Sequence, residues 1–538
     1  MNFADRLTRH AAEHPFQRAL VRPAGLDPRD GRRLWSHLTF RELDARSDRA
    51  ARGFRDRVGI QRGELVLMLV EPGFDFFVVG FGLYKLGAVP VLIDPGMGLA
   101  GFLNCVAQIK PTALVGVPKA MVLSRVKGRA FRSIEKRVTV GASTWFWGGE
   151  TLPMVLLAEP SFENADCGAE EEAGILFTSG STGPAKGVRY THGMFCAQAE
   201  SIASMVDIRP GEVDVPCFLP FAMFSLTLGQ TVVLPDMDFS RPATAQPERV
   251  VEAVMAHGAH QLVGSPAVMK RLARWCPENG VTLPSLRRVL TFGAPIPLDL
   301  HRAFRELLAE GVQIHTPYGA TESLPVASIA SEAVLEGTGA ATARGEGTCV
   351  GSPVDIGTVR IIPITDEAVP EWDESAVVAS GQIGEICVKG PQVSSEYRGL
   401  PEANASSKIR DDEGFWHRMG DLGYLDDEGR LWFLGRKSHR VICSDGALVF
   451  PVALEGVFNT HPGVFRSAVV ELEGEPVLVV ELESGFDRDI EAALLELARA
   501  HEATGRVKRV FFHPGFPVDR RHNAKIHRLQ LRDWVAER

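Results

Sequence analysis

The chain has 538 residues, of which 45% are hydrophobic and 23% are charged, the composition of a folded globular protein and not of a disordered one. Because this length exceeds what one hydrophobic core usually organises, we expect at least two domains, one of them large. The formal net charge of −9 disfavours nucleic acids and anionic membrane surfaces as partners.

The N-terminus and the cysteines indicate the compartment. The first residues, from Met1 to Arg6, lack the apolar stretch of a signal peptide, and no apolar run approaches the roughly 20 residues of a membrane helix. The eight cysteines are scattered singly, without the paired spacing of a zinc ribbon or a redox motif. Scattered thiols fit a reducing compartment, so we expect a cytoplasmic protein without a membrane span.

Strand and helix patterns alternate through the first 330 residues or so. The order strand, helix, strand predicts βαβ units in parallel sheets, and therefore a large α/β domain with helices layered on the sheets. The predicted helices are 40–60, 74–87, 250–257 and 298–308, and the predicted strands are 65–70, 89–93, 174–177, 260–263 and 286–292.

The pattern changes near Val350. Short apolar runs at 359–362, 384–388 and 431–434 are separated by turns rich in Gly, Pro and Asp, which predicts a small antiparallel, barrel-like β region. After Arg436 a smaller α+β unit begins, with a predicted helix over 491–501. The small, polar stretch 340–347 is typical of a flexible surface loop.

The sharpest signal is the segment 177–187, Phe-Thr-Ser-Gly-Ser-Thr-Gly-Pro-Ala-Lys-Gly, which follows a predicted buried strand. Its glycines allow close backbone approach, its hydroxyl and N–H groups can donate to phosphate oxygens, and Lys186 adds a positive charge, so the loop suits a triphosphate. A Walker-type phosphate loop needs Gly-Lys-Ser/Thr, which is absent. A Gly/Ser linker rarely connects a buried strand to an ordered stretch. The candidate phosphate ligands are Thr178, Ser179, Gly180, Ser181, Thr182, Gly183 and Lys186.

Three shorter motifs add groups that a nucleotide needs. Residues 318–322, Tyr-Gly-Ala-Thr-Glu, combine an aromatic ring for a purine, a hydroxyl for a phosphate and a carboxylate for Mg²⁺. Asp421 can accept hydrogen bonds from ribose hydroxyls, and Arg436 can hold the same sugar. Lys525, in a short polar loop, can pair with a carboxylate and a phosphate as they react. Each motif alone also fits an ordinary turn or surface residue.

Together and in this order, the four motifs resemble the adenylate-forming superfamily, which includes acyl-CoA synthetases, luciferases and the adenylation domains of peptide synthetases. The match extends from Phe40 to Lys525. The resemblance implies a large adenylation domain over 1–435, which holds the ATP and acyl pockets. It also implies a small mobile domain over 436–538 that carries Lys525 and pivots at Lys437 or Ser438.

The resemblance also implies ATP and Mg²⁺ as cofactors and a role for each motif residue. The segment from Thr178 to Lys186 would hold the phosphates, Gly293-Ala294-Pro295 would line one face of the adenine, and Tyr318, followed by Gly319, would line the other. Thr321 would contact the α-phosphate, Glu322 would be the metal ligand, and Asp421 and Arg436 would bind the ribose. Lys525 would promote adenylation, so the implied catalytic residues are Lys525, Lys186, Thr321 and Glu322.

Two departures narrow the resemblance. Met223 stands where many acyl-CoA synthetases have a histidine, and residues 438–446 lack the Ile-Lys-x-x-Gly pattern that helps to admit the pantetheine thiol. With the segments 93–97 and 520–525, these departures resemble the β-lactone synthetases of bacterial long-chain olefin biosynthesis. That resemblance implies ATP-dependent activation of a long-chain 2-alkyl-3-hydroxy acid as its acyl-AMP. The acid's own hydroxyl then closes a β-lactone, with release of AMP and pyrophosphate.

Alternatives remain at this stage. A fatty acyl-CoA synthetase or fatty acyl-AMP ligase fits the same motifs, and a degenerate nucleotide-binding scaffold is disfavoured because the charged motif residues are present. His315 and His192 are candidates for the base only by residue type, and each also fits a structural role. Acyl-pocket walls are expected around 221–228 and 263–269. Expected partners are ATP, a fatty β-hydroxy acid and, by the resemblance, other olefin-pathway enzymes.

Overall fold

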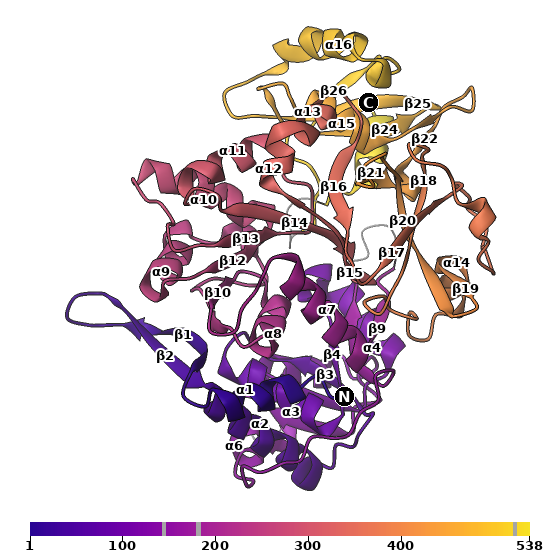
Figure 1. Ribbon diagram of the computed structural model, residues 1–538. Helices are drawn as coiled ribbons and strands as arrows, with labels where there is room; N and C mark the ends of the chain where they lie inside the picture. The colour runs from indigo at the N-terminus through magenta and orange to yellow at the C-terminus, as the bar shows by residue number, and fades with distance from the viewer. Residues whose placement is uncertain (143–146, 179–183, 520–524) are drawn as a thin grey trace.

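A computed structural model of the chain describes residues 1–142, 147–178, 184–519 and 525–538. In Figure 1 the N-terminal residues form the lower part of the molecule, the middle of the chain forms the left side, and the C-terminal residues lie at the top. The strands fall into two large sheets and two smaller ones. The predicted fold class is confirmed, since a large α/β part precedes a smaller C-terminal part that has its own sheet.

The first sheet has seven strands in the order β7-β6-β5-β3-β4-β8-β9. Neighbours run parallel except β8 and β9. The predicted βαβ unit is confirmed, because β3 and β4 pair in parallel around α3, which is buried along almost its whole length. The strands are β3 (Leu65–Leu69), β4 (Val89–Leu92), β5 (Ala113–Gly116), β6 (Lys136–Thr139), β7 (Glu150–Thr151), β8 (Glu172–Phe177) and β9 (Gly187–Thr191). The helices of this part are α1 (Asp5–Glu13), α2 (Phe40–Gly53), α3 (Phe74–Leu86), α4 (Gly98–Ile109), α5 (Pro118–Val126), α6 (Leu152–Val155) and α7 (His192–Met205).

The second sheet runs β2-β1-β11-β10-β12-β13-β14-β15-β16, with a parallel centre from β1 to β14. Its two faces bury different cores, because Val263 and Leu290 face the first sheet's helices while their neighbours Leu262 and Val289 face α9 to α11. The strands are β1 (Arg18–Leu26), β2 (Arg33–Thr39), β10 (Val213–Pro216), β11 (Thr231–Val233), β12 (Gln261–Gly264), β13 (Arg288–Thr291), β14 (Gln313–Ala320), β15 (Ser323–Ala330) and β16 (Thr348–Pro353). The helices are α8 (Leu219–Thr227), α9 (Pro247–His257), α10 (Pro266–Glu278), α11 (Leu298–Leu307) and α12 (Ser331–Ala333).

The predicted antiparallel β region follows. From β16 the sheet continues in the order β21-β20-β18-β17. β19 pairs with the first residues of β20, on the edge opposite β18. The tight turn after β20 is formed by Asp426, which accepts from the N–H of Arg430 and from the indole of Trp432. The elements are β17 (Thr358–Ile362), β18 (Gly384–Lys389), α14 (Pro401–Ser407), β19 (Lys408–Asp411), β20 (Gly414–Leu425) and β21 (Leu431–Arg436).

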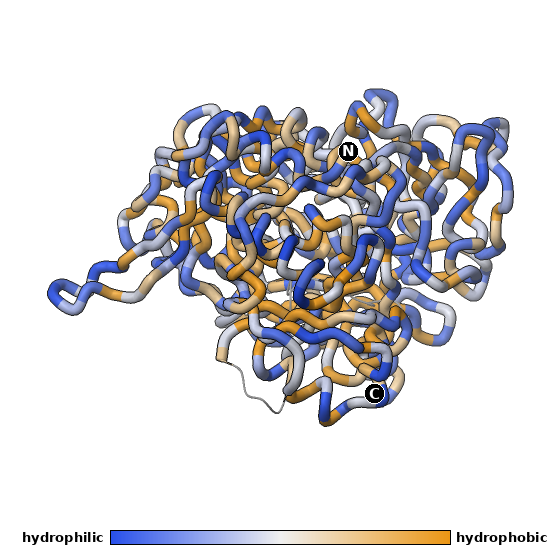
Figure 2. The backbone as a smooth tube through the Cα atoms, turned by 90° about the horizontal axis from the view of Figure 1, so that it is seen from below, coloured by the Kyte–Doolittle hydropathy of each residue, from blue (hydrophilic) through white to orange (hydrophobic). Residues whose placement is uncertain are grey.

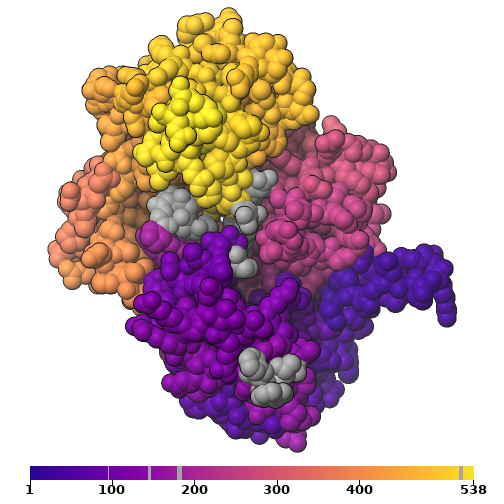
Figure 3. All heavy atoms as spheres, turned by 180° about the vertical axis from the view of Figure 1, so that it is seen from behind, coloured from indigo at the N-terminus to yellow at the C-terminus, as the bar shows by residue number. Residues whose placement is uncertain are grey.

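The residues after Arg436 form a three-stranded sheet, β24-β25-β26, and a two-stranded hairpin, β22-β23. Their core is continuous with Leu422 and Leu434 of β20 and β21, so this part packs firmly on the β region. From behind, it forms the top of the molecule, above the N-terminal part of the chain (Figure 3). The elements are β22 (Val441–Ile442), β23 (Leu448–Val449), α15 (Pro451–Phe458), β24 (Val464–Leu472), β25 (Glu475–Leu482), α16 (Glu491–Ala500), β26 (Val510–Phe512) and α17 (Arg528–Ala536).

The expectation of a flexible loop over 340–347 is wrong. Residues Gly339–Ala343 form helix α13, and Ala341 is only 6% exposed in a cluster with Cys349 and Trp432. A Cβ atom on Gly456 of α15 would stand 2.5 Å from the Thr342 carbonyl oxygen, so α13 and α15 pack in close contact. The small side chains of this stretch serve close helix packing, which composition alone does not distinguish from a loop.

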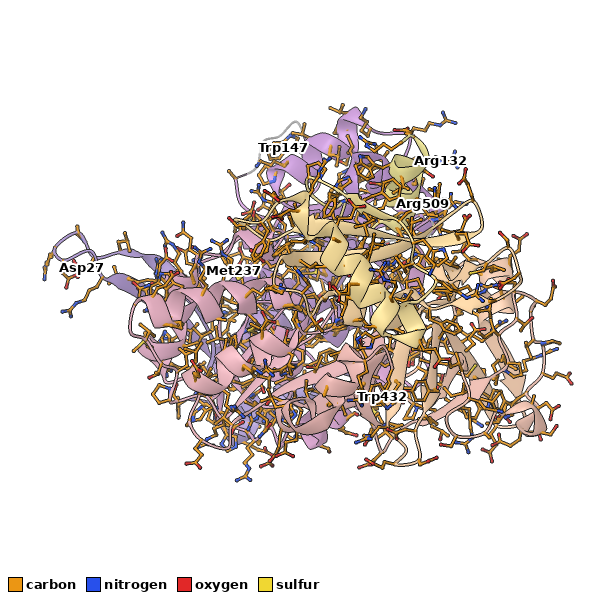
Figure 4. The ribbon with its side chains drawn as sticks, turned by 90° about the horizontal axis from the view of Figure 1, so that it is seen from above. Asp27, Arg132, Trp147, Met237, Trp432 and Arg509 are labelled. Carbon is orange, nitrogen blue, oxygen red and sulfur yellow. The ribbon has the colours of Figure 1, made fainter. Side chains whose placement is uncertain are left out.

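One element extends away from the body of the protein. β1 and β2 form a hairpin whose tip, marked by Asp27, projects from the edge of the second sheet (Figure 4). The tip is hydrophilic, whereas apolar segments concentrate within the body (Figure 2). None of the helices in the described ranges combines the length and the apolar content that crossing a bilayer requires.

Candidate active site

The phosphate-loop motif joins two strands of the first sheet. β8 and β9 pair as an antiparallel hairpin in which Phe177 is opposite Gly187. At the base of the loop, the Thr178 N–H donates to the Lys186 carbonyl at 3.0 Å, and the Lys186 N–H donates to Thr178 Oγ1 at 3.1 Å. The structure therefore fixes both ends of the loop. Ser179, Gly180, Ser181, Thr182 and Gly183, which we predicted as phosphate ligands, lie outside the described residues.

Lys186 and Glu322 come together on a tyrosine that the sequence motifs did not include. The Lys186 ammonium lies 4.6 Å from the centre of the Tyr397 ring, over its face, and the Tyr397 hydroxyl donates to Glu322 Oε1 at 2.6 Å. The backbone of Tyr397 is held on both sides by Asn404, whose Oδ1 accepts from its N–H at 2.6 Å and whose Nδ2 donates to its carbonyl at 3.0 Å. Tyr397 thus connects the phosphate loop to the predicted metal ligand.

Thr321 and Glu322 form the turn between β14 and β15. The Tyr190 hydroxyl, from β9, donates to the Thr321 carbonyl at 2.6 Å, so the turn is anchored to the strand that follows the phosphate loop. Within β14, a Cβ on Gly319 would lie 2.5 Å from the Ser323 carbonyl oxygen. Only glycine fits there, which explains the Tyr-Gly pair of the motif in packing terms.

Tyr318 reaches the third motif. Its hydroxyl donates to Asp421 Oδ2 at 2.6 Å, and Arg436 Nη1 lies 3.1 Å from Asp421 Oδ1. Asp421 and Arg436 are register partners on β20 and β21, which explains why residues far apart in the motif share one site. Burial raises the pKa of Asp421, and Arg436 opposes that shift.

One acceptor of this buried carboxylate is available. Asp421 Oδ1 receives no properly oriented hydrogen bond from the described residues, although Arg436 is at ion-pair distance. The Arg436 side chain keeps 37% of its surface accessible to solvent. A buried acceptor beside a solvent-reachable guanidinium suits a ligand that brings hydroxyl donors.

Lys525 approaches the same group. Its N–H donates to Asp519 Oδ1 at 2.8 Å and its carbonyl accepts from the Asp519 N–H at 3.0 Å, which fixes the backbone before α17. The positive charge of Lys525 contributes to lowering the pKa of Asp421, against the effect of burial. Lys525 is therefore near enough to Asp421 for its charge to act on that carboxylate.

The turn Gly293-Ala294-Pro295 follows β13, as expected from the sequence. Gly293 has a φ of +102°, a conformation that favours glycine. The preceding Phe292 stacks with Phe221 at 5.9 Å and meets Phe218 edge-on at 5.2 Å, which builds an aromatic wall from β13 and α8. Of these three rings, Phe221 lies in the segment 221–228, where we expected part of an acyl pocket.

Met223 makes apolar contact within the same region. Its Cε would lie 3.4 Å from a Cβ on Gly80 of α3, so the position of the histidine found in many acyl-CoA synthetases is packed against a helix. In the segment 263–269, where we expected the other wall of the acyl pocket, a Cβ on Gly264 would be 3.1 Å from Met269 Cε. Both segments therefore present apolar side chains, and neither places a charge there.

The two histidines that we considered as candidate bases, His192 and His315, lie in different parts of the fold. His192 is buried, its Nδ1 accepts from the Phe3 N–H at 3.0 Å, and burial lowers its pKa to about 4, so its role is structural. Burial also lowers the pKa of His315 to about 4. His315 is in register with Leu290 and Ala330 in the middle of the second sheet.

Tyr397, Lys408 and His417 belong to the site although no motif indicated them. His417 is buried, and both burial and the charges of Lys408, Lys186 and Arg436 lower its pKa well below the usual range, so it is a neutral member of a cationic environment. One signal was present in the composition. The chain has only five tyrosines, and three of them, Tyr190, Tyr318 and Tyr397, donate hydrogen bonds to motif residues.

A metal ion at this site would have to share its coordination with a ligand. No cluster of three or more His, Cys, Asp or Glu side chains suited to a metal occurs within the described ranges. Glu322 accepts one hydrogen bond, from Tyr397, and in the part of the chain that the structure describes no second one reaches its carboxylate. A single carboxylate with free acceptor positions is what Mg²⁺ uses when phosphate oxygens complete its shell.

The fold and these clustered groups define a class. The family model of the AMP-binding enzymes matches residues 7–398, and the chain belongs to this family. ATP-bound MatB from Rhodopseudomonas palustris has the same fold, with a TM-score of 0.79 at 22% identity over 100% of this chain and 99% of that one.

Closer relatives refine the class. The chain is 44% identical to the olefin β-lactone synthetase of Xanthomonas campestris over 100% of its own length and 98% of the relative. It is 43% identical to the olefin β-lactone synthetase of Stenotrophomonas maltophilia, with 99% and 98% coverage. The resemblance that the sequence motifs indicated is thereby confirmed.

Proposed function

We propose that this protein is an ATP-dependent β-lactone synthetase. It activates a long-chain 2-alkyl-3-hydroxy acid as its acyl-AMP and closes the β-lactone through the acid's own hydroxyl, releasing AMP and pyrophosphate. The observation that carries the proposal is full-length similarity at 44% identity to a protein named for this activity. The charged groups that the described structure gathers around Tyr397 and Asp421 support it independently.

The residues divide between the parts of the nucleotide. Thr178 to Lys186 hold the phosphates, and Asp421 with Arg436 holds the ribose, for which the available Oδ1 acceptor is suited. Gly293-Ala294-Pro295 and Tyr318 border the adenine. Thr321 contacts the α-phosphate.

Mg²⁺ fits beside Glu322, whose carboxylate has acceptor positions free among the described residues. When bound, the ion supplies charge that offsets the phosphate oxygens. Tyr397 orients Glu322 without adding a charge of its own, so the carboxylate keeps its full attraction for the cation. Any ATP complex of this chain should therefore show Glu322 at the metal.

The first half-reaction joins two anions. A carboxylate oxygen of the acid attacks the α-phosphorus and pyrophosphate leaves, and the charge that accumulates at the α-phosphate is stabilised by the Lys525 ammonium. Lys525 belongs to a C-terminal domain, 436–538, that we propose moves relative to residues 1–435 about Lys437 or Ser438.

The second half-reaction is intramolecular. The 3-hydroxyl oxygen attacks the acyl carbonyl, the bond to the phosphate breaks, and AMP leaves with its electron pair while the hydroxyl proton passes to the departing phosphate or to water. The attacking oxygen is already held on the same molecule, which replaces a bimolecular encounter with thiol. Met223 packs against α3, which supports an apolar acyl site. An apolar site would exclude the water that competes with the hydroxyl.

Product analysis tests the function. The purified chain would be incubated with ATP, Mg²⁺ and a 2-alkyl-3-hydroxy acid, with and without CoA, and the organic product analysed by mass spectrometry. The proposal expects a product 18 mass units below the acid, equally in both samples, from the loss of one water in lactone formation. A product that forms only with CoA would identify the alternative, a fatty acyl-CoA synthetase, and accumulated acyl-AMP would identify a fatty acyl-AMP ligase.

Two further proposals concern the cell. All eight cysteines are free and buried, which supports a reducing cytoplasm as the compartment. Association with other enzymes of olefin biosynthesis would keep a reactive, apolar lactone from dispersing into water. Co-purification of such enzymes with the chain from its source tests this association.

A further inference from the structure

Lys408 is a half-buried lysine beside Tyr397 in the candidate site. It begins β19, directly after α14, and its ammonium donates to the Ser394 carbonyl. The same ammonium lies 5.9 Å from the centre of the Tyr397 ring and 5.0 Å from that of Phe415. Lysine usually keeps its charged head in water, so a lysine head within 6 Å of two aromatic ring centres requires an explanation.

The surroundings do not neutralise this charge. Within the described residues no carboxylate forms an ion pair with Lys408, and Glu322 acts on it only through its longer-range field. Burial lowers the pKa of Lys408 to about 7. An anion bound beside Lys408 would raise this pKa again and keep the ammonium fully charged. A methionine would fill the same space between the rings without the desolvation cost, so packing alone does not account for lysine here.

The position of Lys408 indicates which anion it serves. Tyr397 carries the Lys186 ammonium over its ring at 4.6 Å and donates to Glu322, so both lysines stand around one ring beside the proposed metal ligand. The ribose groups Asp421 and Arg436 are joined to a different tyrosine, Tyr318. The phosphate end of the nucleotide is therefore the end that Lys408 borders.

We infer that Lys408 is a second ammonium for the pyrophosphate portion of ATP, which it holds together with Lys186 around the Tyr397 ring. The inference rests on the proposed function in that pyrophosphate is the leaving group. Pyrophosphate takes up the electron pair of the bond that breaks at the α-phosphorus, and a cation already in place stabilises it without rearrangement.

Direct binding of pyrophosphate tests the inference. Isothermal titration of the full chain with magnesium pyrophosphate would compare the wild type with Lys408→Met, which keeps the length of the side chain, and Lys408→Arg, which keeps the charge. The expected affinity falls about 10- to 100-fold in the Met variant, in line with loss of one charge-assisted contact, and stays within about threefold in the Arg variant. Lys127→Met, at an exposed lysine, is the matched control and should bind as the wild type does.

Two results would overturn the assignment. One is pyrophosphate affinity in Lys408→Met within about twofold of the wild type, and the other is an equal loss of AMP and pyrophosphate affinity, which would indicate a general structural defect. If the Met variant does not fold, ¹³C-methylated lysines of the wild-type chain decide, with the Lys408 signal assigned by Lys408→Arg. Pyrophosphate should shift that signal and AMP should not; an unmoved signal refutes the inference. Neither measurement needs an acid substrate, so absence of lactone formation would leave this result interpretable.

Discussion

Asp421→Asn tests the ribose site most directly, because the contacts of this side chain with the described residues are known. The carboxylate accepts from Tyr318 at 2.6 Å, pairs with Arg436 at 3.1 Å and keeps Oδ1 available. A hydrogen bond from a ribose hydroxyl to a carboxylate contributes about 1.5–3 kcal/mol. The ion pair with Arg436 contributes only about 0–1 kcal/mol, because the guanidinium is 37% exposed and solvent screens the attraction. The total of about 1.5–4 kcal/mol corresponds to AMP affinity lower by about 10- to 1,000-fold.

Calorimetric titration with AMP measures this loss. Tyr318→Phe removes one donor to Asp421 and should cost about tenfold or less, and the double variant should lose less than the sum because the two residues form one network. Asp427→Asn, an exposed carboxylate in the turn after β20, is the control and should bind AMP normally. An Asp421→Asn variant that binds AMP within about threefold of the wild type would refute the assignment of the ribose to this carboxylate.

Three further changes test the remaining roles. Lys525→Ala should slow pyrophosphate exchange into ATP by about 100-fold or more while ATP affinity stays within about threefold, because the ammonium acts on developing charge; equal losses in both would contradict that role. Glu322→Gln should raise the Mg²⁺ concentration for half-maximal exchange about tenfold, and an unchanged magnesium titration would remove it as a ligand. Burial raises the pKa of Asp214 to about 7, and Ser225 donates to its Oδ2 at 2.7 Å. Since the folded state then favours the protonated acid, wild-type unfolding free energy should fall relative to Asp214→Asn by up to about 1.4 kcal/mol per pH unit from about pH 4 to pH 7; parallel denaturation curves would disprove this.

Much of the fold could be predicted because the signals were local. The predicted helices 74–87 and 298–308 match α3 (Phe74–Leu86) and α11 (Leu298–Leu307) to within a residue at each end. These segments carry apolar spacing and end near glycine or a polar turn, so the information lies within the element itself. Helix α13 was missed because its small residues acquire meaning only from Trp432 and α15, whose positions no local pattern gives.

The residues of the candidate site also divide into those that a local pattern predicted and those that it could not predict. Asp421, Arg436 and Glu322 could be predicted because they stand in ordered motifs of a recognisable superfamily. Tyr397 and Lys408 could not, since each is an isolated residue whose significance is a contact with Glu322 or Ser394 that folding creates. The role of residues 179–183 as phosphate ligands stays a proposal, since they lie outside the described residues.

The two tyrosines explain how a strongly charged site keeps its carboxylates useful. Tyr318 donates at 2.6 Å to Asp421, the carboxylate proposed for the ribose, and Tyr397 donates at 2.6 Å to Glu322, the carboxylate proposed for Mg²⁺. An arginine in either place would orient the carboxylate as well, but it would also cancel the charge that attracts Mg²⁺ or polarises a ribose hydroxyl. Because burial raises the pKa of both phenols further above the physiological range, they remain neutral donors, while Lys186 and Arg436 supply the positive charges on the proposed phosphate side and ribose side. Orientation and charge thus reside on different side chains, and this separation would let one compact site hold the proposed anion, cation and sugar together.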